Sequence, residues 1–286
     1  MALYVPERKV WTGSRARSLS INDNHELSRY IKVAVASGTC FERVSDTALT
    51  KTSGIKEGEY LYSAGNAGDK ATLSTNSGTP SELTIMCRFA RTAINREAGL
   101  YSDRNLANWG SNQGTTLMAR ADGGAGFYVG SGYATKSNLS TNDLLWHTVV
   151  GTANVNEIPT LYVDGVKIST LSTSATFTSI SSSSINARLF TYYDESSTRS
   201  HIGYIDYVYV FYKKLSDIQV YSLLDNPRQI FAPRRQWFAI NTNSSTLRVP
   251  FKTATGADDN IWLTTDNTLR FNNAAGYYDP IASISV

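Results

Sequence analysis

Cysteine and charge are scarce in this chain, and each shortage excludes a class of protein. Two cysteines, Cys40 and Cys87, among 286 residues make neither a disulfide framework nor a thiolate metal cluster, although a single bridge between them stays open. Charged residues are 18% of the chain, and 27 basic against 24 acidic residues leave a formal net charge of +3. Proteins that hold nucleic-acid phosphates carry a larger basic excess, so nucleic acid is excluded as a partner.

Long apolar runs are missing as well. No segment reaches the length that a membrane-spanning helix needs, and the N-terminus lacks the uninterrupted apolar core of a signal peptide. The hydrophobic fraction is nevertheless 41%, which is enough for a sizeable core in a chain of this length. The composition therefore predicts a soluble, globular protein that does not contact a membrane.

Helical periodicity is rare, and strand signals take its place. Only 215–224 has a convincing amphipathic helical pattern, with Ser216 as N-cap and Pro227 just beyond its end. Elsewhere 17 tyrosines, 10 phenylalanines and 5 tryptophans stand among turn-forming Gly, Asn and Ser. In 83–89 every second residue is apolar, Cys87 included, which predicts a strand with one buried face. These patterns predict an all-β protein, a sandwich or a barrel.

Two further stretches carry specific expectations. Residues 202–212 are the most aromatic strand of the chain, and strict alternation would place Ile205 and Tyr207 together on the face opposite Asp206. Residues 169–184 hold twelve Ser or Thr out of sixteen, but apolar residues recur among them. This pattern predicts a polar-faced edge strand and a loop rather than low-complexity disorder.

The chain divides into three predicted parts. Residues 1–36 are predicted to form an extended basic arm. Its Trp11 favours an arm that docks on its own domain or on a neighbour, rather than a floppy terminus. Residues 37–238 form the main β domain. Residues 239–286 form a small β appendage with strands at 247–251, 260–264 and 268–271. A tail this small cannot build a core of its own, so it is expected to pack on the main domain or on another copy of the chain.

Four local patterns carry a resemblance to a known family. They are Leu83-Thr-Ile-Met-Cys-Arg-Phe, Trp146-His147 followed by Val149-Val150, Leu161-Tyr-Val-Asp-Gly165, and Ile202-Gly-Tyr-Ile-Asp206 with Leu215-Ser-Asp-Ile. In this order and spacing, residues 55–232 resemble the laminin-G-like, concanavalin-A-like family, although Cys87 and Arg88 depart from its usual strand. The resemblance implies an antiparallel jelly-roll β-sandwich. The flanks 6–11 and 226–233 resemble those of such domains in tailed-bacteriophage structural proteins.

Catalytic patterns are missing from the sequence. Glycan-cleaving enzymes on this sandwich carry carboxylates that alternate along one strand and so point into one cleft. None of the nine glutamates begins such a run: Glu57 and Glu59 fall in a predicted turn, and Asp194 and Glu195 would face opposite ways. The three histidines lack zinc spacing, and His147 is interpreted as a packed structural residue. The sequence therefore predicts a protein that is not an enzyme, and a glycosidase built from acids on separate strands is the weakest alternative.

Binding residues are suggested more weakly. The resemblance leaves calcium open, because many domains of this family bind it at the rim of the sandwich; the carboxylate and amide candidates are Asp103, Asn105, Asp194 and Glu195. Asp164, which precedes Gly165, is expected to shape a hairpin instead. Sugar binding needs exposed aromatic rings beside polar groups. The candidates in predicted loops are Trp109, Tyr133, Tyr192 and Tyr193.

The first functional hypothesis is a structural protein of a bacteriophage particle, located in the virion as a capsid decoration or a tail or head appendage. Its partners would be other virion proteins and copies of itself in a homo-oligomer. The expected assembly residues are the basic and aromatic side chains of the flanks, Arg8, Lys9, Trp11, Arg15, Arg17, Phe231, Arg234, Arg235, Trp237 and Phe238. The alternative is a lectin that adheres to host surface glycan.

Overall fold

The computed structural model describes most of the chain between residues 21 and 231. The described stretches are 21–36, 41–45, 47–76, 78–93, 96–104, 114–180, 185–192, 195 and 199–231, together with the backbone of four strands between 247 and 283. The chain splits into two compact units, residues 1–234 and 235–286, and each is described by itself. No helix in the described part has both the length and the apolar character needed to cross a bilayer.

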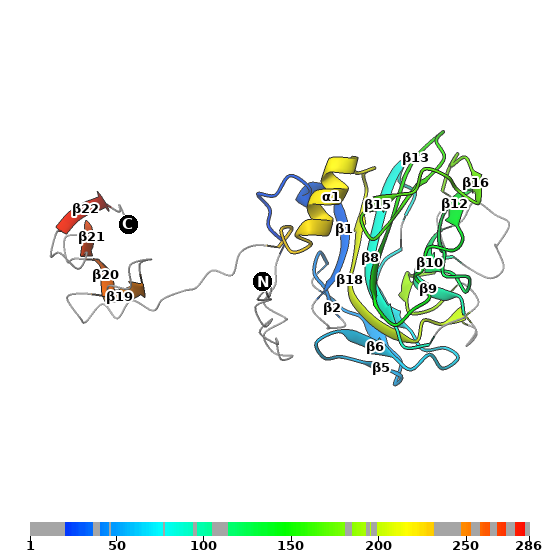
Figure 1. The fold of residues 1–286 in the computed structure, drawn as a ribbon, viewed down its shortest axis with the longest axis horizontal. Helices are drawn as coiled ribbons and strands as arrows, with labels where there is room; N and C mark the ends of the chain where they lie inside the picture. The colour runs from blue at the N-terminus through cyan, green and yellow to red at the C-terminus, as the bar shows by residue number, and fades with distance from the viewer. Residues whose placement is uncertain are drawn as a thin grey trace, which may run out of the picture. The chain divides into compact units, whose positions relative to one another are not determined.

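The first unit is a sandwich of two antiparallel sheets (Figure 1). The larger sheet has the order β15-β14-β13-β8-β18-β1-β2-β3, with β6 also paired to β18 and β5 paired to β6. Its strands are β1 (Ile31–Ala36), β2 (Phe41–Glu42), β3 (Thr47–Ala48), β5 (Ile55–Lys56), β6 (Leu61–Ser63), β8 (Glu82–Arg91), β13 (Trp146–Asn154), β14 (Thr160–Val163), β15 (Val166–Lys167) and β18 (Gly203–Phe211).

The second sheet has the order β16-β12-β11-β10-β9-β17-β7-β4. Its strands are β4 (Thr50–Lys51), β7 (Ala71–Thr72), β9 (Ala98–Ser102), β10 (Thr115–Ala119), β11 (Ala125–Val129), β12 (Gly132–Lys136), β16 (Thr173–Ala175) and β17 (Arg188–Leu189). The predicted all-β antiparallel sandwich is confirmed. The Ser/Thr-rich stretch contributes β16, which is an exposed edge strand as expected.

The main core lies between the two sheets. The alternating apolar residues predicted in 83–89 all point into it and are fully buried, and Cys87 among them is a free thiol. Phe127 of β11 packs from the opposite sheet directly over Gly151 of β13. The alternation of the sequence therefore specifies this core, because a strand with apolar residues at every second position can bury only one face.

Replacing Gly151 with alanine should destabilise the sandwich by about 1–3 kcal/mol, the usual penalty for overpacking a core. An added Cβ at this position would lie 2.1 Å from Cγ of Phe127, which is itself fully buried and cannot move aside. The matched control is Gly58→Ala, whose Cβ would meet nothing closer than 3.8 Å. Urea denaturation of both variants tests this prediction, and an unchanged midpoint for Gly151→Ala would contradict it.

A second core lies on the outer face of the larger sheet, where the helix α1 (Asp217–Asp225) packs (Figure 1). Ser216 caps α1 in a capping box with Gln219, and the helix ends at Asn226, immediately before Pro227. Val220 and Leu223 of α1 are buried in this outer core. The predicted helix and both of its ends are confirmed.

A β-bulge overturns the alternation predicted for 202–212. The pairing of β18 with β8 shifts register between Ile205 and Tyr207. Ile205 consequently points into the core between the sheets, whereas Tyr207 packs in the outer core. The prediction that these two side chains share a face is wrong, because a bulge inserts one extra residue and inverts the alternation beyond it. Asp206 lies at the bulge, and its Oδ2 accepts a hydrogen bond of 2.7 Å from Arg88 Nη1.

The described part of the predicted N-terminal arm joins the sandwich. Strand β1 lies in the larger sheet between β18 and β2, and a single 3-10 turn, η2 (Ser28–Tyr30), precedes it. Ile21 forms an antiparallel bridge with Phe231. Residues 31–36 are therefore part of the sheet rather than of an arm, because their apolar side chains are buried on both of its faces.

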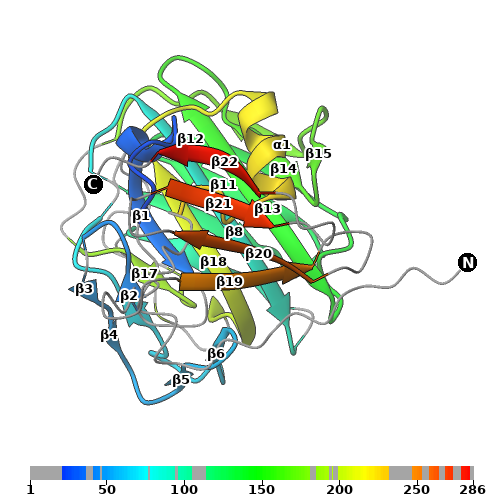
Figure 2. The same cartoon turned by 90° about the vertical axis from the view of Figure 1, so that its left-hand side faces the viewer.

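The second unit contains an antiparallel meander of four strands, β19 (Leu247–Lys252), β20 (Asp258–Leu263), β21 (Thr268–Asn272) and β22 (Tyr278–Ser283), which follow one another in sequence order (Figure 2). The three predicted strands are present, and the structure adds β22. Pro280 interrupts the strand pattern in β22, and the pairing of this strand has a register shift. Both β19 and β22 are edge strands, where a proline is tolerated because one side of the backbone has no partner.

Candidate functional site

A row of side chains crosses four neighbouring strands near one end of the larger sheet. Trp146 of β13 pairs with Ala90 of β8, Ala90 pairs with Tyr204 of β18, and Tyr204 pairs with Tyr62 of β6. Their chain neighbours Leu61, Phe89 and Ile205 are buried in the main core. Because side chains alternate across a sheet, the row projects from the outer face. The small Ala90 leaves the space between the aromatic rings open.

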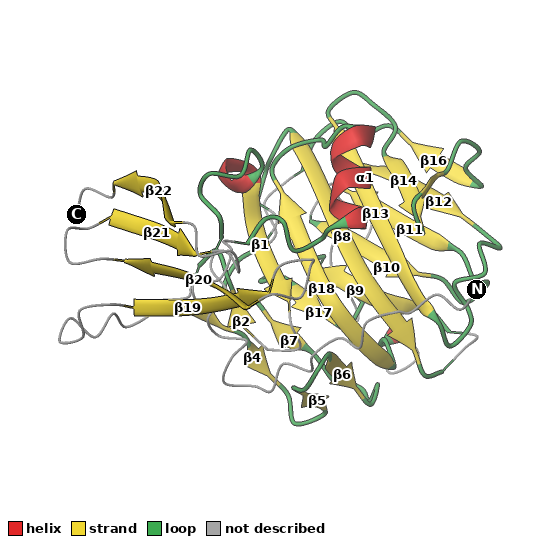
Figure 3. Ribbon diagram, turned by 60° about the vertical axis from the view of Figure 1, so that its left-hand side comes forward, coloured by secondary structure: helices red, strands yellow, loops and turns green. Residues whose placement is uncertain are grey.

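Four aromatic rings gather around this row. The ring centroids of Tyr60 and Trp146 are 4.5 Å apart, and those of Tyr62 and Tyr204 are 5.0 Å apart. Tyr204, which is 38% exposed, lies 6.4 Å from both Tyr60 and Trp146 and connects the two pairs. The helix α1 covers the same face of the sheet near its other end, whereas β5 and β6 lie near the end that carries the rings (Figure 3). The rings therefore remain accessible.

The rings line a groove of about 650 Å³, which we call the aromatic groove. Its lining residues are Lys56, Glu57, Gly58, Glu59, Tyr60, Tyr62, Ala90, Arg91, Thr92, Leu144, Trp146 and Tyr204. Leu144 is 66% exposed. The turn 56–59 supplies an exposed rim with one lysine and two glutamates, and Lys51 forms an ion pair of 2.9 Å with Glu57. The volume suits a small ligand or part of a larger one.

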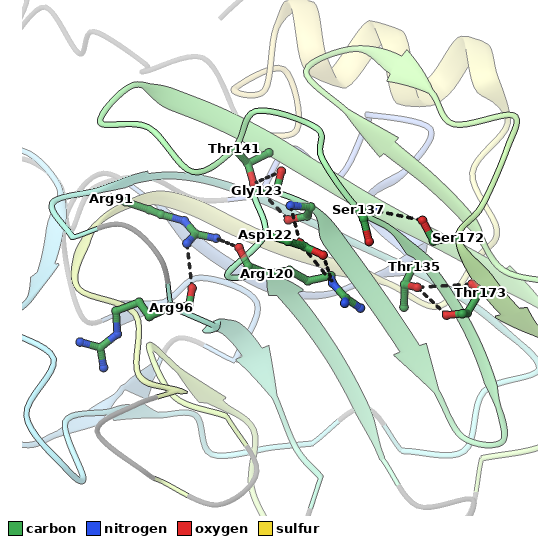
Figure 4. A network of polar contacts seen from close by, with 11 residues as sticks. Arg91, Arg96, Arg120, Asp122, Gly123, Thr135, Ser137, Thr141, Ser172 and Thr173 are labelled. Carbon is green, nitrogen blue, oxygen red and sulfur yellow. Dashed lines mark hydrogen bonds and ion pairs between the residues drawn. The ribbon is translucent and has the colours of Figure 1, made fainter.

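Two guanidinium groups beside the aromatic groove are already engaged by the protein. Arg88 donates to Asp206, and its guanidinium carbon lies 4.8 Å from the centroid of the Trp146 ring. Arg91 is 2% exposed; its Nη1 and Nη2 donate to the main-chain oxygens of Arg96 and Arg120 at 2.8 and 2.9 Å (Figure 4). Burial lowers the pKa of Arg91 to about 10. The Arg91 side chain therefore connects β8 to the second sheet at the point where this residue lines the groove.

The loop 137–145 precedes Trp146 and supplies Leu144 to the groove. Thr141 in this loop donates from Oγ1 to the main-chain oxygens of Gly123 and Gly124, both at 3.0 Å (Figure 4). Ser137 N–H donates to Ser172 Oγ at 3.1 Å. These bonds attach the first half of the loop to the second sheet, so the groove wall is built on a fixed base.

The second half of the loop is held by His147. His147 Nε2 lies 2.7 Å from Asp143 Oδ1, and its Nδ1 lies 2.7 Å from Asp164 Oδ2. Asp143 Oδ1 also accepts from Leu145 N–H, and Asp164 Oδ1 accepts from Thr148 N–H. The hydrogen bond to Asp164 raises the pKa of His147, as does the one to Asp143, against the opposing effect of burial. His147 is thus a packed residue, as interpreted from sequence, and its two partners are carboxylates.

The two described sugar-binding candidates chosen from sequence, Tyr133 and Tyr192, do not line the aromatic groove. Tyr133 is in strand β12 instead of a loop, with its ring 5.8 Å from that of Tyr128. Tyr192 is 3% exposed, so its ring is covered. Trp109 and Tyr193 fall outside the described residues. No single stretch of sequence signals the aromatic groove, since its aromatic residues come from segments 60–62, 146 and 204, and only the strand order brings them together.

Of the predicted assembly residues, the structure describes Phe231, which is buried in the outer core with its ring 6.0 Å from that of Tyr209. The others, Arg8, Lys9, Trp11, Arg15, Arg17, Arg234, Arg235, Trp237 and Phe238, lie outside the described residues. Cys40 also falls outside them.

The described calcium candidates are bonded to protein donors. Asp103 is buried and accepts a hydrogen bond from Thr115 N–H, and Glu195 pairs with Lys70 at 2.6 Å and with Arg188. Asn105 and Asp194 are not among the described residues. Within the described stretches, no three His, Cys, Asp or Glu side chains gather as metal ligands. Asp164 adopts a positive φ of 49° before Gly165, which agrees with its predicted place in a hairpin turn.

Comparison with known proteins identifies the family. Residues 64–221 match the model of the concanavalin A-like lectin/glucanases superfamily, which covers more than half of the chain. The chain therefore belongs to this superfamily. No curated protein matches it.

Solved structures with a similar fold include binding domains of bacterial toxins. The binding domain of Paraclostridial Mosquitocidal Protein 1 is 14% identical with a TM-score of 0.52, over 89% of this chain and 68% of that one. The binding domain of botulinum neurotoxin serotype D is 11% identical with a TM-score of 0.51, over 87% and 72%. Botulinum neurotoxin type C, whose cell entry depends on interaction with two ganglioside molecules, is 12% identical with a TM-score of 0.50, over 86% and 73%. At these identities the likeness concerns the fold alone.

Proposed function

We propose that the sandwich is a non-enzymatic glycan-binding domain and that the aromatic groove is its binding site. The observation that carries the proposal is the row of Trp146, Tyr204 and Tyr62 on an exposed sheet end of a lectin-superfamily fold. Aromatic rings offer large, rigid apolar surfaces beside which a few polar groups orient a ligand. A sugar matches this combination, because its ring has an apolar face and an edge of hydroxyl groups.

The charges around the groove favour a neutral glycan over an acidic one. A sugar carboxylate is held best by a guanidinium with free donors. Both Nη atoms of Arg91 donate to main-chain oxygens of the protein, and the charge of Arg88 is balanced by the carboxylate of Asp206. On the rim, Lys51 and Lys56 balance the charges of Glu57 and Glu59, so the rim has no net positive charge that would attract an acidic sugar. The same carboxylates can accept hydrogen bonds from sugar hydroxyls.

The placement of these glutamates also supports binding without cleavage. Hydrolysis of a glycosidic bond needs two carboxyl groups that flank it. Glu57 and Glu59 come from one exposed turn and so approach a ligand from the same side. We therefore infer that the groove holds a glycan but does not cut it.

A glycan array that contains neutral and sialylated oligosaccharides tests the ligand class. We expect the full chain to bind a subset of the neutral glycans. Binding confined to sialylated glycans would refute the neutral class while leaving glycan binding in place. Release of reducing sugar from a bound oligosaccharide, followed over hours, would refute the absence of catalysis.

We further propose that the chain displays this domain on a bacteriophage particle, as a capsid decoration or as a tail or head appendage, with other virion proteins and copies of itself as partners. The support is the resemblance of the flanks 6–11 and 226–233 to those of tailed-phage structural proteins. Quantitative mass spectrometry of purified particles tests this role. A copy number near that of the major capsid protein indicates a decoration protein, a few copies indicate an appendage, and complete absence overturns the proposal.

A further inference from the structure

His147 joins two chain segments that meet beside the aromatic groove. Asp143 belongs to the loop 137–145, and Asp164 belongs to the turn between β14 and β15. Each carboxylate lies 2.7 Å from a different nitrogen of the same imidazole. We call these three residues the His147 clamp.

The number of protons on His147 decides whether both bonds can exist. A neutral imidazole has one N–H donor, and its other nitrogen is an acceptor. An ionised carboxylate only accepts, so two carboxylates on one imidazole require both nitrogens to be protonated. Loss of one proton therefore breaks one bond and leaves a nitrogen lone pair facing a carboxylate oxygen. The geometry of the clamp thus corresponds to the imidazolium.

The clamp is connected to the groove through very short stretches of chain. Leu144, the exposed wall of the groove, is the next residue after Asp143, and Trp146 immediately precedes His147. Asp143 Oδ1 accepts from both Leu145 N–H and His147 Nε2, so it ties the turn 143–145 to the start of β13. Thr141 holds only the first half of the loop. The position of Leu144 against Trp146 therefore depends on the clamp.

We propose that the His147 clamp positions the wall of the aromatic groove, so that ligand affinity falls as pH rises and His147 loses its proton. This inference rests on the proposed function, because it describes the regulation of the same site. Asp143 and His147 are positioning residues: neither lines the groove, and both act through Leu144 and Trp146.

The groups around His147 agree on the direction of this effect. The facing side chains are Asp143 from the loop, Asp164 from the β14–β15 turn and the uncharged ring of Phe89 from β8, and Arg91 acts on Asp143 from nearby. The pKa of His147 lies above its ordinary 6.5. The pKa of Asp143 lies below its ordinary 3.8, although burial acts to raise it. The hydrogen bonds from His147 and Leu145 N–H and the charges of His147 and Arg91 outweigh that effect. The clamp is therefore complete between these two pKa values and opens above the raised pKa of His147.

The experiment combines binding and NMR on the full chain as a function of pH. A neutral oligosaccharide found on the array is titrated by calorimetry from pH 5 to pH 9, and the histidine signals are followed over the same range. We expect the affinity for the oligosaccharide to fall about two- to fivefold across the titration of His147. This is the loss expected when an ion pair that is partly exposed to solvent is broken. His201 is an internal control: burial lowers its pKa to about 3, so its signals should not titrate in this range.

Asp143→Asn separates positioning from simple structural support. The asparagine oxygen can still accept from His147 and Leu145, but it has no charge to favour the imidazolium. We expect the wild-type affinity at pH 5 and a midpoint of the affinity change that moves to lower pH together with the pKa of His147. Affinity that is flat across the His147 titration, or a midpoint that does not move in the variant, would overturn the inference.

The clamp can also be tested without a ligand. The methyl signals of Leu144 and the indole N–H signal of Trp146 should shift with the pKa of His147. If no glycan binds at any pH but these signals follow the titration, the proposed function fails while the positioning by the clamp stands. If the signals do not follow it, the clamp does not control the groove wall, whatever binds there.

Discussion

Replacing Trp146 with alanine should abolish measurable glycan binding and leave the sandwich folded. Trp146 has the largest ring of the aromatic groove; this ring lies 4.5 Å from that of Tyr60 and 6.4 Å from that of Tyr204, and the guanidinium of Arg88 lies over its face. Truncation of an aromatic anchor that dominates a binding site removes 2 kcal/mol or more of binding free energy, which is about 30-fold in affinity. Calorimetry with a neutral oligosaccharide measures the loss. Trp146 projects from the outer face at the end of its strand, so the main core keeps its packing.

A second aromatic truncation controls for general effects on the surface. Tyr221 is exposed on α1, far along the same sheet face from the groove, and its ring contacts Tyr162. Tyr221→Ala removes a ring of similar size and should leave affinity unchanged. If Trp146→Ala binds as tightly as the wild type, the aromatic groove is not the binding site. If Tyr221→Ala loses affinity equally, the loss reflects the fold rather than the groove.

Replacing Arg91 with methionine should reduce the free energy of unfolding by about 2–4 kcal/mol. The substitution leaves two part-buried main-chain oxygens, those of Arg96 and Arg120, without their donor, and each hydrogen bond to a charged group contributes about 1.5–3 kcal/mol. Removal of a buried charge offsets part of this loss, because the burial that lowers the pKa of Arg91 also penalises its charged form. Urea denaturation measures the change.

Arg120→Met is the matched control for Arg91→Met. The Arg120 side chain is partly exposed and pairs with Asp122 at 3.3 Å, while its main-chain oxygen is the acceptor for Arg91. The control therefore removes a surface ion pair but keeps the bond between the sheets, and it should change stability by less than about 1 kcal/mol. Equal stability losses in the two variants would show that the bonds of Arg91 do not hold the two sheets together.

Local signals in the sequence correctly predicted those elements that depend on neighbouring residues. The alternation in 83–89 placed Cys87 in the core, because a strand repeats every two residues. Ser216 and Pro227 marked the ends of α1, since caps and prolines act within one turn of a helix. The proline-containing strand β22 was missed, because an edge strand tolerates a residue that the pattern treats as a break.

The aromatic groove and the His147 clamp depend on residues far apart in the sequence. Trp146, Tyr204 and Tyr62 become neighbours only through the order and register of β13, β8, β18 and β6. A shift of one residue in β13, β18 or β6 would turn the ring of that strand into the core. Asp143 and Asp164 likewise meet at one imidazole because β13 and β14 pair in a hairpin. Strand order and register are therefore the information that local sequence patterns do not contain.

The sequence by itself determined that this protein is all-β, because composition, alternation and helix caps act over a few residues and can be read directly. The concanavalin A-like type of sandwich was implied by the resemblance of its motifs to the family and not by these local signals. The tertiary structure alone decided where the bulge at Ile205 and Tyr207 inverts a strand, and which aromatic rings remain on the surface. The physical reason is that pairing between distant strands sets register, and register decides which face of the sheet each side chain occupies.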